Sequence, residues 1–349
     1  MTGGGTGGHV TPNLALIPRL QADGWEIHYI GGANSAEQEL ISRVPGVTFY
    51  TVSVGKLRRY FDLKNFSDPF RVIKGVAQAT GIIRRIKPNV VFSKGGFVSV
   101  PVVYGAKLNG VPVVTHESDL TPGLANKLCL PFAKAQCCTF PEAVKYSKGK
   151  GVYTGTPIRP EILSGSRAAG LKRFGLNESL PVLMVVGGST GAQAVNECVR
   201  AALPELTSTF QVLHLCGKGN RAPELDGAQN YVQCEYLNEE MAYAYACADA
   251  LISRAGANAL CEILALRKPA LLIPYPSSAS RGDQILNAQS FESRGLSRVL
   301  DQAQMTPETL TKAVVSLYHD RGALYDAMAG ENTTNGIDSV LEQIYKYAK

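Results

Sequence analysis

Five glycines occur within positions 3–8, and His9 follows them directly at the start of an apolar helical pattern. Glycine lets the main chain approach a ligand without a Cβ atom in the way. The amides of such a loop and of the helix N-terminus attract an anion. An imidazole is largely neutral at pH 7 and can accept a proton. The stretch therefore predicts an anion-binding loop with His9 as general base; the alternative is a flexible glycine-rich terminus.

Similar glycine segments recur after apolar strands further along the chain. Gly95-Gly96-Phe97 follows residues 89–93, and Gly187–Ala192 follows residues 181–186. Within the latter segment, Ser189 either binds a phosphate together with nearby amides or simply caps the next helix.

Two later helices carry polar residues that suit a sugar or ribose. Glu262 can accept two hydrogen bonds from a diol, or it can serve as a surface carboxylate that complements the helix dipole. Gln284 offers both a donor and an acceptor for sugar hydroxyls. Arg159 lies between the two halves of the chain, where it can reach a ligand of either one.

Three classes of site are disfavoured by what the motifs lack. The glycine loops have no Gly-Lys-Ser/Thr ending, which a Walker NTPase needs. The strand predicted after the first glycine loop, at 25–32, ends in Gly31-Gly32-Ala33-Asn34 and offers no acidic residue for a dinucleotide ribose. The five histidines show no paired ligand spacing, so neither a metal nor a cofactor is predicted.

Apolar strand patterns alternate with helical patterns twice over. The predicted strands lie at 25–32, 47–52, 89–93, 112–117, 181–186, 211–216, 231–235, 250–253 and 269–274. This alternation predicts α/β domains with parallel sheets covered on both faces. We expect two Rossmann-like domains facing a cleft, residues 1–157 and 158–336, with the last helix, 337–348, packed back on the first domain.

Positive charge is concentrated in the first domain. Residues 1–158 hold 18 Lys and Arg against 9 Asp and Glu, whereas the remainder holds 17 against 20. The helix predicted at 68–86 carries apolar positions rimmed by basic ones, which indicates either an ordinary core helix or an anionic membrane surface as partner. The candidate membrane patch comprises Arg71, Val72, Lys74, Arg84 and Arg85, with Leu57–Phe61 nearby. No nucleic-acid partner is expected.

The order and spacing of these motifs resemble the MurG family, the N-acetylglucosaminyltransferases of peptidoglycan synthesis, over essentially the whole chain. The matching segments are Gly4–Pro12, Gly95–Phe97, His116–Lys127, Gly187–Ala192, Ala257–Glu262 and Asp283–Ala288. The resemblance implies a GT-B fold and an inverting transfer of N-acetylglucosamine from UDP-N-acetylglucosamine to the muramyl-pentapeptide of lipid I, which yields lipid II. It also implies a peripheral protein on the cytoplasmic face of the cell membrane.

Residue roles follow from the resemblance position by position. The donor is expected at Thr6, Gly7, Gly8, Arg159, Ser189, the Leu237 backbone, Ala257, Asn258, Ala259, Leu260, Glu262 and Gln284. The acceptor diphosphate is expected at Gly4, Gly5, Gly95, Gly96 and Asn126, and His9 is the expected base. Asp119 stands where some members of the family have Asn, and we exclude it from the donor site because a carboxylate repels a diphosphate.

Two other functions stay open from the sequence. One is a GT-B enzyme that glycosylates another lipid, such as a diacylglycerol. The other is an inactive UDP-sugar-binding scaffold, against which the presence of His9, Glu262 and Gln284 argues.

The first glycine loop should follow a buried central strand, yet only Met1 and Thr2 precede it. A missing central strand leaves backbone groups of both neighbours unpaired. We therefore expect the native protein to start several residues earlier with a short apolar strand. If Met1 is the true start, we expect a damaged first domain and impaired activity.

Overall fold

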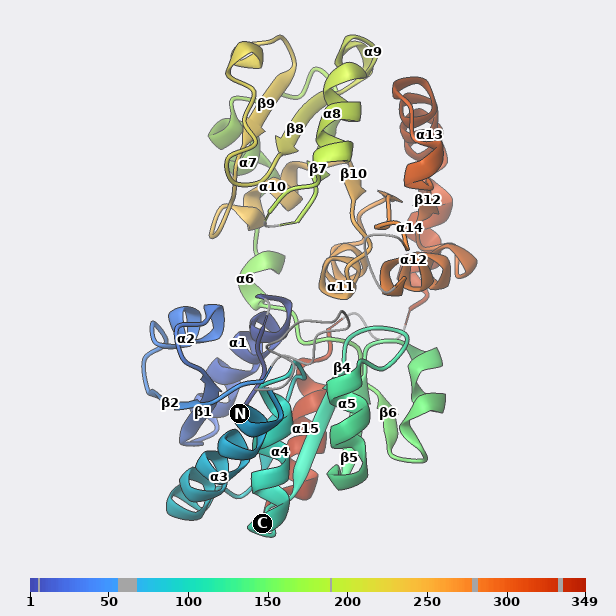
Figure 1. The fold of residues 1–349 in the computed structure, drawn as a ribbon. Helices are drawn as coiled ribbons and strands as arrows, with labels where there is room; N and C mark the ends of the chain where they lie inside the picture. The colour runs from blue at the N-terminus through green and yellow to red at the C-terminus, as the bar shows by residue number, and fades with distance from the viewer. Residues whose placement is uncertain (6, 56–67, 189, 278–281, 332–334) are drawn as a thin grey trace. The chain divides into compact units, whose positions relative to one another are not determined.

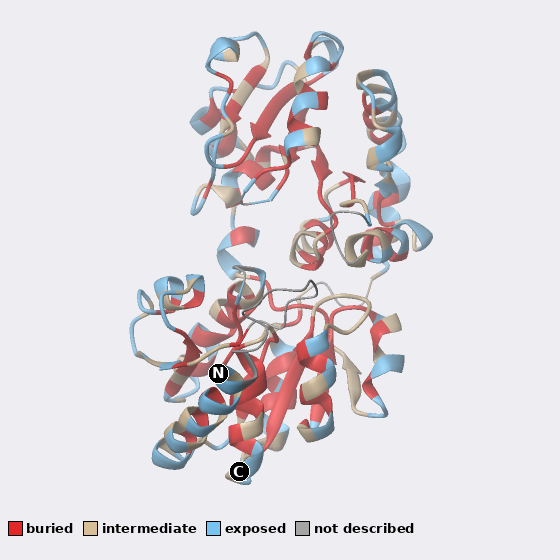
Figure 2. Ribbon diagram, in the orientation of Figure 1, coloured by how far each residue is buried: buried red, intermediate tan, exposed pale blue. Residues whose placement is uncertain are grey.

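The chain folds into two compact α/β units in the computed structural model, which describes all residues except 6, 56–67, 189, 278–281 and 332–334 (Figure 1). Unit 1 comprises Met1–Arg159 and Asn335–Lys349, and unit 2 comprises Pro160–Thr334. The strands of both units are largely buried (Figure 2). Every strand pair is parallel, so the predicted fold class of two parallel-sheet domains is confirmed.

Unit 1 contains two strands on one side of a gap and four on the other, in the order β2-β1 and β3-β4-β5-β6. The strands are β1 (Ile27–Gly32), β2 (Val47–Val52), β3 (Val91–Ser93), β4 (Val113–Glu117), β5 (Ala135–Cys138) and β6 (Gly151–Tyr153). The helices are α1 (Gly7–Ala22), α2 (Ala36–Ile41), α3 (Asp68–Ile86), α4 (Ser99–Leu108), α5 (Leu124–Cys129) and α15 (Ile337–Tyr347).

Alternating side chains of these strands form two apolar cores, as the two-residue period of a strand requires. Tyr29 and Phe92 point to one face, where they pack with residues of α1 and α15. Ile30 and Val91 point to the other face and pack with α3, α4 and α5. The C-terminal helix α15 is therefore part of the core of unit 1.

Unit 2 has one sheet in the order β12-β11-β10-β7-β8-β9. Its strands are β7 (Val182–Val186), β8 (Gln211–Leu215), β9 (Tyr231–Cys234), β10 (Ala250–Ser253), β11 (Ala270–Leu272) and β12 (Arg298–Val299). Its helices are α6 (Pro160–Leu163), α7 (Arg167–Phe174), α8 (Gln193–Ala201), α9 (Leu203–Thr209), α10 (Met241–Cys247), α11 (Ala257–Ala265), α12 (Asp283–Ser293), α13 (Pro307–His319) and α14 (Arg321–Ala329).

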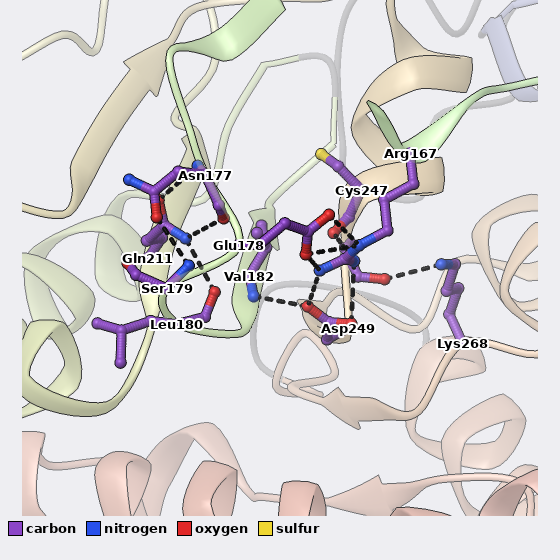
Figure 3. A network of polar contacts seen from close by, with 11 residues as sticks. Arg167, Asn177, Glu178, Ser179, Leu180, Val182, Gln211, Cys247, Asp249 and Lys268 are labelled. Carbon is purple, nitrogen blue, oxygen red and sulfur yellow. Dashed lines mark hydrogen bonds and ion pairs between the residues drawn. The ribbon is translucent and has the colours of Figure 1, made fainter. Parts of the chain in front are cut away.

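A polar network ties together the amino ends of β7 and β10 (Figure 3). Arg167 Nη1 donates to Asp249 Oδ1 at 3.0 Å and to Cys247 O at 2.9 Å, and Arg167 also pairs with Glu178 at 3.1 Å. The other oxygen of Asp249 accepts from Val182 N at 2.8 Å. This network lies at the amino ends of the strands. The candidate donor-binding loops begin at the opposite end of the sheet, where the strands have their carboxyl ends.

Met1 and Thr2 occupy the gap between β1 and β3. Thr2 forms parallel bridges to both Ile30 and Ser93. Thr2 N donates to Phe92 O at 2.9 Å, and Ile30 N donates to Met1 O at 2.9 Å. Two residues therefore stand where the glycine-loop pattern predicts a central strand, and they join the two parts of the sheet only near its carboxyl edge.

A cavity of about 550 Å³ continues this gap toward the amino ends of β1 and β3. Ile27 and Val91 line it from the two strands, while Ile344 and Ile83 line it from helices on the two faces. The α-amino group of Met1 donates to His28 O, and burial lowers the pKa of this amino group from 8.0 to about 5. Isoleucine and valine side chains thus line the cavity from both faces of the sheet.

An extension of five alternating valines and isoleucines ahead of Met1 is expected to stabilise the protein. Filling a cavity between packed elements recovers the contacts that an empty core site forfeits, which is worth about 3 kcal/mol or more. Thermal unfolding of the extended and unextended chains measures the gain.

The pH dependence of stability provides a second readout of the same extension. Between pH 5 and pH 8 the Met1 amino group is neutral when folded and charged when unfolded. The unfolded state then binds more protons, so the free energy of unfolding of the unextended chain rises with pH, by about 1.4 kcal/mol per unit. A glycine–serine extension of equal length should remove this slope without filling the cavity. Equal stabilisation by the two extensions would contradict the account.

Candidate active site

The two glycine loops of unit 1 pack main chain against main chain. Gly4 N donates to Gly95 O at 3.3 Å. A Cβ atom on Gly96 would lie 2.0 Å from Gly4 O, and the φ of Gly96 is +81°. Only glycine meets both conditions at this position. The structure therefore brings Gly4 and Gly5 from the first loop next to Gly95 and Gly96 from the second.

Asn126 joins this cluster through its side chain. A Cβ atom on Gly95 would lie 3.2 Å from the Asn126 amide, which is 5% exposed. Asn126 Nδ2 donates to His116 O at 3.0 Å and to Glu117 Oε2 at 2.8 Å, which fixes the orientation of the amide. Among the described residues, Asn126 Oδ1 has no hydrogen-bond partner. The atom that Asn126 offers to a ligand is thus an oxygen, which suits a hydroxyl or N–H group better than a phosphate.

His9 lies in the first turn of α1, and its ring is half-buried. The carbonyl of His9 accepts from Asn13 Nδ2 at 3.5 Å, so its main chain is held from the next helical turn. Gly7 and Gly8 precede it in the same turn, while Thr6 lies outside the described residues. In the loop before this turn, Gly5 N donates a hydrogen bond to Glu37 Oε2 at 3.2 Å.

Lys94 is a charged residue of this region that the sequence analysis missed. Its side chain is fully buried, and its ammonium donates to the Ser118 hydroxyl. His116 lies nearby on β4, and its Nε2 is 2.9 Å from Gly155 O. Burial, and secondarily the charge of Lys94, hold the pKa of His116 well below 6.5. The position of Lys94 directly before Gly95-Gly96 is the sequence feature from which a cation at this site could have been predicted.

Two loops of unit 2 also approach each other through glycines. Gly191, after β7, has a φ of +77°, and its Cβ atom would lie 2.1 Å from Cys216 O. Gly217, after β8, has a φ of +90°, and its Cβ atom would lie 2.3 Å from Gly191 N. Ser189 lies outside the described residues, so its predicted phosphate contact stays a prediction. The described residue Gly191 packs its main chain tightly against Cys216 and Gly217.

Helix α11 begins immediately after β10 and carries the predicted donor segment. Ala257, Asn258, Ala259 and Leu260 form its first turn, and the Leu260 side chain is fully buried, which leaves only its main chain for a ligand. Glu262 follows one turn later and is half-buried. Its Oε2 accepts from Tyr245 Oη at 3.0 Å, so a residue of α10 orients the carboxylate. Sequence reasoning missed Tyr245 because nothing in the chain pattern pairs it with Glu262.

Gln284 belongs to a second supported group at the start of α12. Its Oε1 accepts from Tyr275 N at 3.2 Å, which leaves its amide nitrogen as the group that can donate to a ligand. The guanidinium of Arg254 lies 4.0 Å from the centre of the Tyr275 ring and donates to Ile273 O at 2.9 Å. Burial lowers the pKa of Arg254. Arg254, also missed from the sequence, therefore connects the ends of β10 and β11 to Gln284.

The remaining predicted donor residues have separate positions. Leu237 follows β9, and its side chain is buried; its predicted backbone contact with the donor stays a prediction. Arg159 is the last residue of the first segment of unit 1 and is half-buried. The buried Nε atom of Arg159 has no hydrogen-bond partner among the described residues.

The candidate membrane patch divides along α3. Arg71, Lys74, Arg84 and Arg85 are all exposed, whereas Val72 is half-buried and lines an apolar groove of about 710 Å³ between α3 and α4. The exposed apolar side chains Phe70 and Ile73 lie at this end, with exposed fractions of 74% and 66%. Leu108, exposed to 69%, ends α4 further along the groove, where the next residue, Asn109, donates to Thr80 O. At the other end of α3, Arg85 lies over the Tyr50 ring at 5.5 Å. Leu57–Phe61 lies outside the described residues, and none of the described helices is long and apolar enough to cross a membrane.

Comparison with known proteins places this arrangement in a family. The glycosyltransferase family 28 N-terminal domain matches residues 1–137, and the family 28 C-terminal domain matches residues 182–344. A Clostridium botulinum (strain Loch Maree) protein is 52% identical over 100% of this chain and 99% of its own length. It is named UDP-N-acetylglucosamine–N-acetylmuramyl-(pentapeptide) pyrophosphoryl-undecaprenol N-acetylglucosamine transferase. A protein of the same name from Lachnoclostridium phytofermentans is 52% identical over 98% of this chain and 96% of its own length.

The crystal structure of Acinetobacter baumannii MurG superimposes with a TM-score of 0.77 at 27% identity, covering 99% of this chain and 98% of that chain. The chain belongs to the MurG family. The glycosyltransferase of kitacinnamycin also shares the fold, with a TM-score of 0.75 at 19% identity over 100% of this chain and 98% of its own. The two parallel-sheet units and these neighbours confirm the GT-B fold class.

Proposed function

We propose that the chain transfers N-acetylglucosamine from UDP-N-acetylglucosamine to the N-acetylmuramyl-pentapeptide of lipid I, the undecaprenyl-diphosphate-linked acceptor, and so forms lipid II. The observation that carries this proposal is the 52% identity to transferases of that name over the whole chain. The glycine loops, the supported carboxylate Glu262 and the supported amide of Gln284 supply the groups that such a reaction needs.

The donor is assigned to unit 2. The N-terminal turn of α11 and the loop around Gly188 and Gly191 would receive the diphosphate, because helix N-termini and clustered amides attract anions. Glu262, oriented by Tyr245, would accept hydrogen bonds from the two ribose hydroxyls. Gln284 would donate to the hydroxyls of the sugar.

The acceptor is assigned to unit 1. Gly4 N donates to Gly95 O and Gly5 N donates to Glu37, so we assign the acceptor diphosphate to the N-terminal turn of α1 beside them. This proposal gives Gly7 and Gly8 of that turn to the acceptor, whereas the family resemblance gives them to the donor. The same turn carries His9. His9 would take the proton of the acceptor hydroxyl as its oxygen bonds to the anomeric carbon of the donor. The bond from that carbon to the diphosphate oxygen breaks, UDP leaves, and the configuration at the carbon inverts.

The end of α3 that carries Phe70, Ile73, Arg71 and Lys74 is assigned to the membrane. Exposed apolar side chains beside basic ones match an interface with anionic lipid headgroups. Because the lipid-linked acceptor resides in a membrane, this assignment makes the protein a peripheral one on the cytoplasmic face of the cell membrane.

Two variants should separate catalysis from donor binding in an assay of labelled N-acetylglucosamine transfer to a lipid I analogue. His9→Ala should lower kcat at least about 100-fold with little change in the Kd for UDP, because loss of a general base removes a transition-state interaction. Glu262→Ala should raise the Kd for UDP about tenfold or more, since it removes hydrogen bonds to a charged acceptor. Isothermal titration calorimetry gives the Kd values.

Glu224→Ala is the matched control, an exposed glutamate of unit 2. Transfer to a diacylglycerol but not to the lipid I analogue would replace the proposed acceptor. UDP binding without transfer to any acceptor would point to a binding scaffold. Unchanged turnover in His9→Ala would remove His9 from the role of base.

Sedimentation with vesicles tests the membrane assignment. Phe70→Ser/Ile73→Ser should reduce binding to vesicles that contain phosphatidylglycerol, because about 0.8 kcal/mol is lost for each CH₂ group no longer buried. Arg71→Glu/Lys74→Glu should reduce binding more than Arg84→Glu/Arg85→Glu, whose arginines lie at the other end of α3.

Leu163→Ser is the control, an exposed leucine of unit 2 with an exposed fraction of 41%. Binding that is indifferent to anionic lipid and to the α3 variants would refute the assignment.

A further inference from the structure

Glu37 is a buried carboxylate directly beneath the first glycine loop. Its residue is 3% exposed, although it lies on the short surface helix α2. Its Oε2 accepts from Gly5 N at 3.2 Å, and its Oε1 accepts from Gly32 N at 3.1 Å. Among the described residues, no lysine or arginine forms an ion pair with it. Two main-chain amides therefore satisfy this buried charge, which is costly to bury without such partners.

Three glycines leave space for this carboxylate. A Cβ atom on Gly4 would lie 2.4 Å from Glu37 Cδ, and one on Gly31 would lie 3.0 Å from Glu37 Cγ. A Cβ atom on Gly32 would lie 3.3 Å from Glu37 Oε1. Glycines of the first loop and of the end of β1 thus form a niche for the Glu37 side chain.

The same loop is held from its other side by Tyr29 and Asn13. Tyr29 Oη donates to Gly3 O at 2.6 Å and accepts from Asn13 Nδ2 at 2.9 Å. The same amide lies within hydrogen-bond distance of His9 O, at 3.5 Å. Burial raises the pKa of Tyr29, so its hydroxyl stays a donor. Glu37 and Tyr29 therefore hold the loop from two directions. Asn13 links Tyr29 to the main chain of His9.

We propose that Glu37 is a positioning residue of the sugar transfer reaction. By accepting the Gly5 and Gly32 amides, it fixes the loop that leads into α1 and thereby the position of His9. It also occupies the Gly5 amide, which directs the acceptor diphosphate to the first turn of α1. This inference rests on the proposed function, because positioning matters only if His9 acts on an acceptor.

The chemistry of the niche makes glutamine an informative replacement. Glutamine has the volume of glutamate, but one of its two terminal atoms is an NH₂ group that donates. Because both positions face main-chain N–H groups, one of the two hydrogen bonds must be lost whichever way the amide is turned. Glutamine thus preserves the packing of Glu37 while it breaks the contact to either Gly5 or Gly32.

The experiment compares Glu37→Gln and Glu37→Ala with Glu39→Gln, a neighbouring exposed glutamate of α2 that pairs with Arg43. Both Glu37 variants should lower kcat about 10- to 100-fold, the scale of a small misplacement of a catalytic group. Their Kd for UDP should stay within about twofold of the parent value, because donor binding is assigned to unit 2. Glu39→Gln should match the parent chain in both quantities.

Amide hydrogen exchange gives a readout that does not depend on activity. Exchange of the Gly5 or the Gly32 amide should quicken in Glu37→Gln and stay slow in Glu39→Gln. Parental kcat in Glu37→Gln would overturn the inference, since it would mean that the side chain only fills space. A fall in kcat accounted for by loss of folded protein in thermal unfolding would overturn it as well. If the parent chain transfers no sugar, the proposed function fails, while the exchange result still decides whether Glu37 holds the loop.

Discussion

Close packing of main chain against main chain is the constraint on which both halves of the candidate site depend. In unit 1 the carbonyl of Gly4 lies where a side chain on Gly96 would begin, and in unit 2 the loops of Gly191 and Gly217 meet in the same way. Parallel strands bring their carboxyl ends to one edge of a sheet, so the loops that follow them must pass close to one another. Glycine makes that approach possible, and it exposes amides at the same edge.

Close approach alone does not hold a glycine loop in one conformation, because glycine loses more backbone entropy on folding than any other residue. Buried polar side chains meet that need in both units. Glu37 and Tyr29 hold the first loop, and Asn126, which packs beside Gly95 of the second loop, is itself held by the end of β4. In unit 2, the buried Asn196 holds the start of the loop at Gly217, because its Nδ2 atom donates to Cys216 O. These contacts convert flexible loops into defined ones.

The sequence was sufficient to predict most of the architecture, because most of the β-strands are apolar runs that the two-residue period or full burial explains. The short edge strand β12 (Arg298–Val299) has no such pattern and was not predicted. The helix at 68–86 agrees with α3, and the strand at 47–52 agrees with β2. The glycine loops at 95–96 and 187–192 could be located for the same reason, since each follows a strand, whereas the first glycine loop follows only Met1 and Thr2. The family resemblance supplied the individual roles of Glu262 and Gln284, which composition alone leaves open.

The supporting residues could not be predicted, because their partners lie far away in the sequence. Glu37 and Gly5 are separated by 32 positions, and Tyr245 and Glu262 by 17. Which side chains meet across such separations depends on the register of neighbouring strands and on the tilt of each helix. The amides of Gly4 and Gly5 illustrate the point. The glycine pattern suggested that they face a ligand, whereas in the structure they donate hydrogen bonds to Gly95 O and to Glu37 Oε2.

The division of substrates between the two units is the central claim, and backbone-amide NMR titration tests it most directly. UDP should shift the amides of Gly188, Gly191 and the first turn of α11, and leave those of α1 in place. A short-chain lipid I analogue should shift the amides of the first turn of α1, while the Gly5 amide keeps its slow exchange. Shifts from UDP confined to unit 1, or from the acceptor analogue confined to unit 2, would contradict the account.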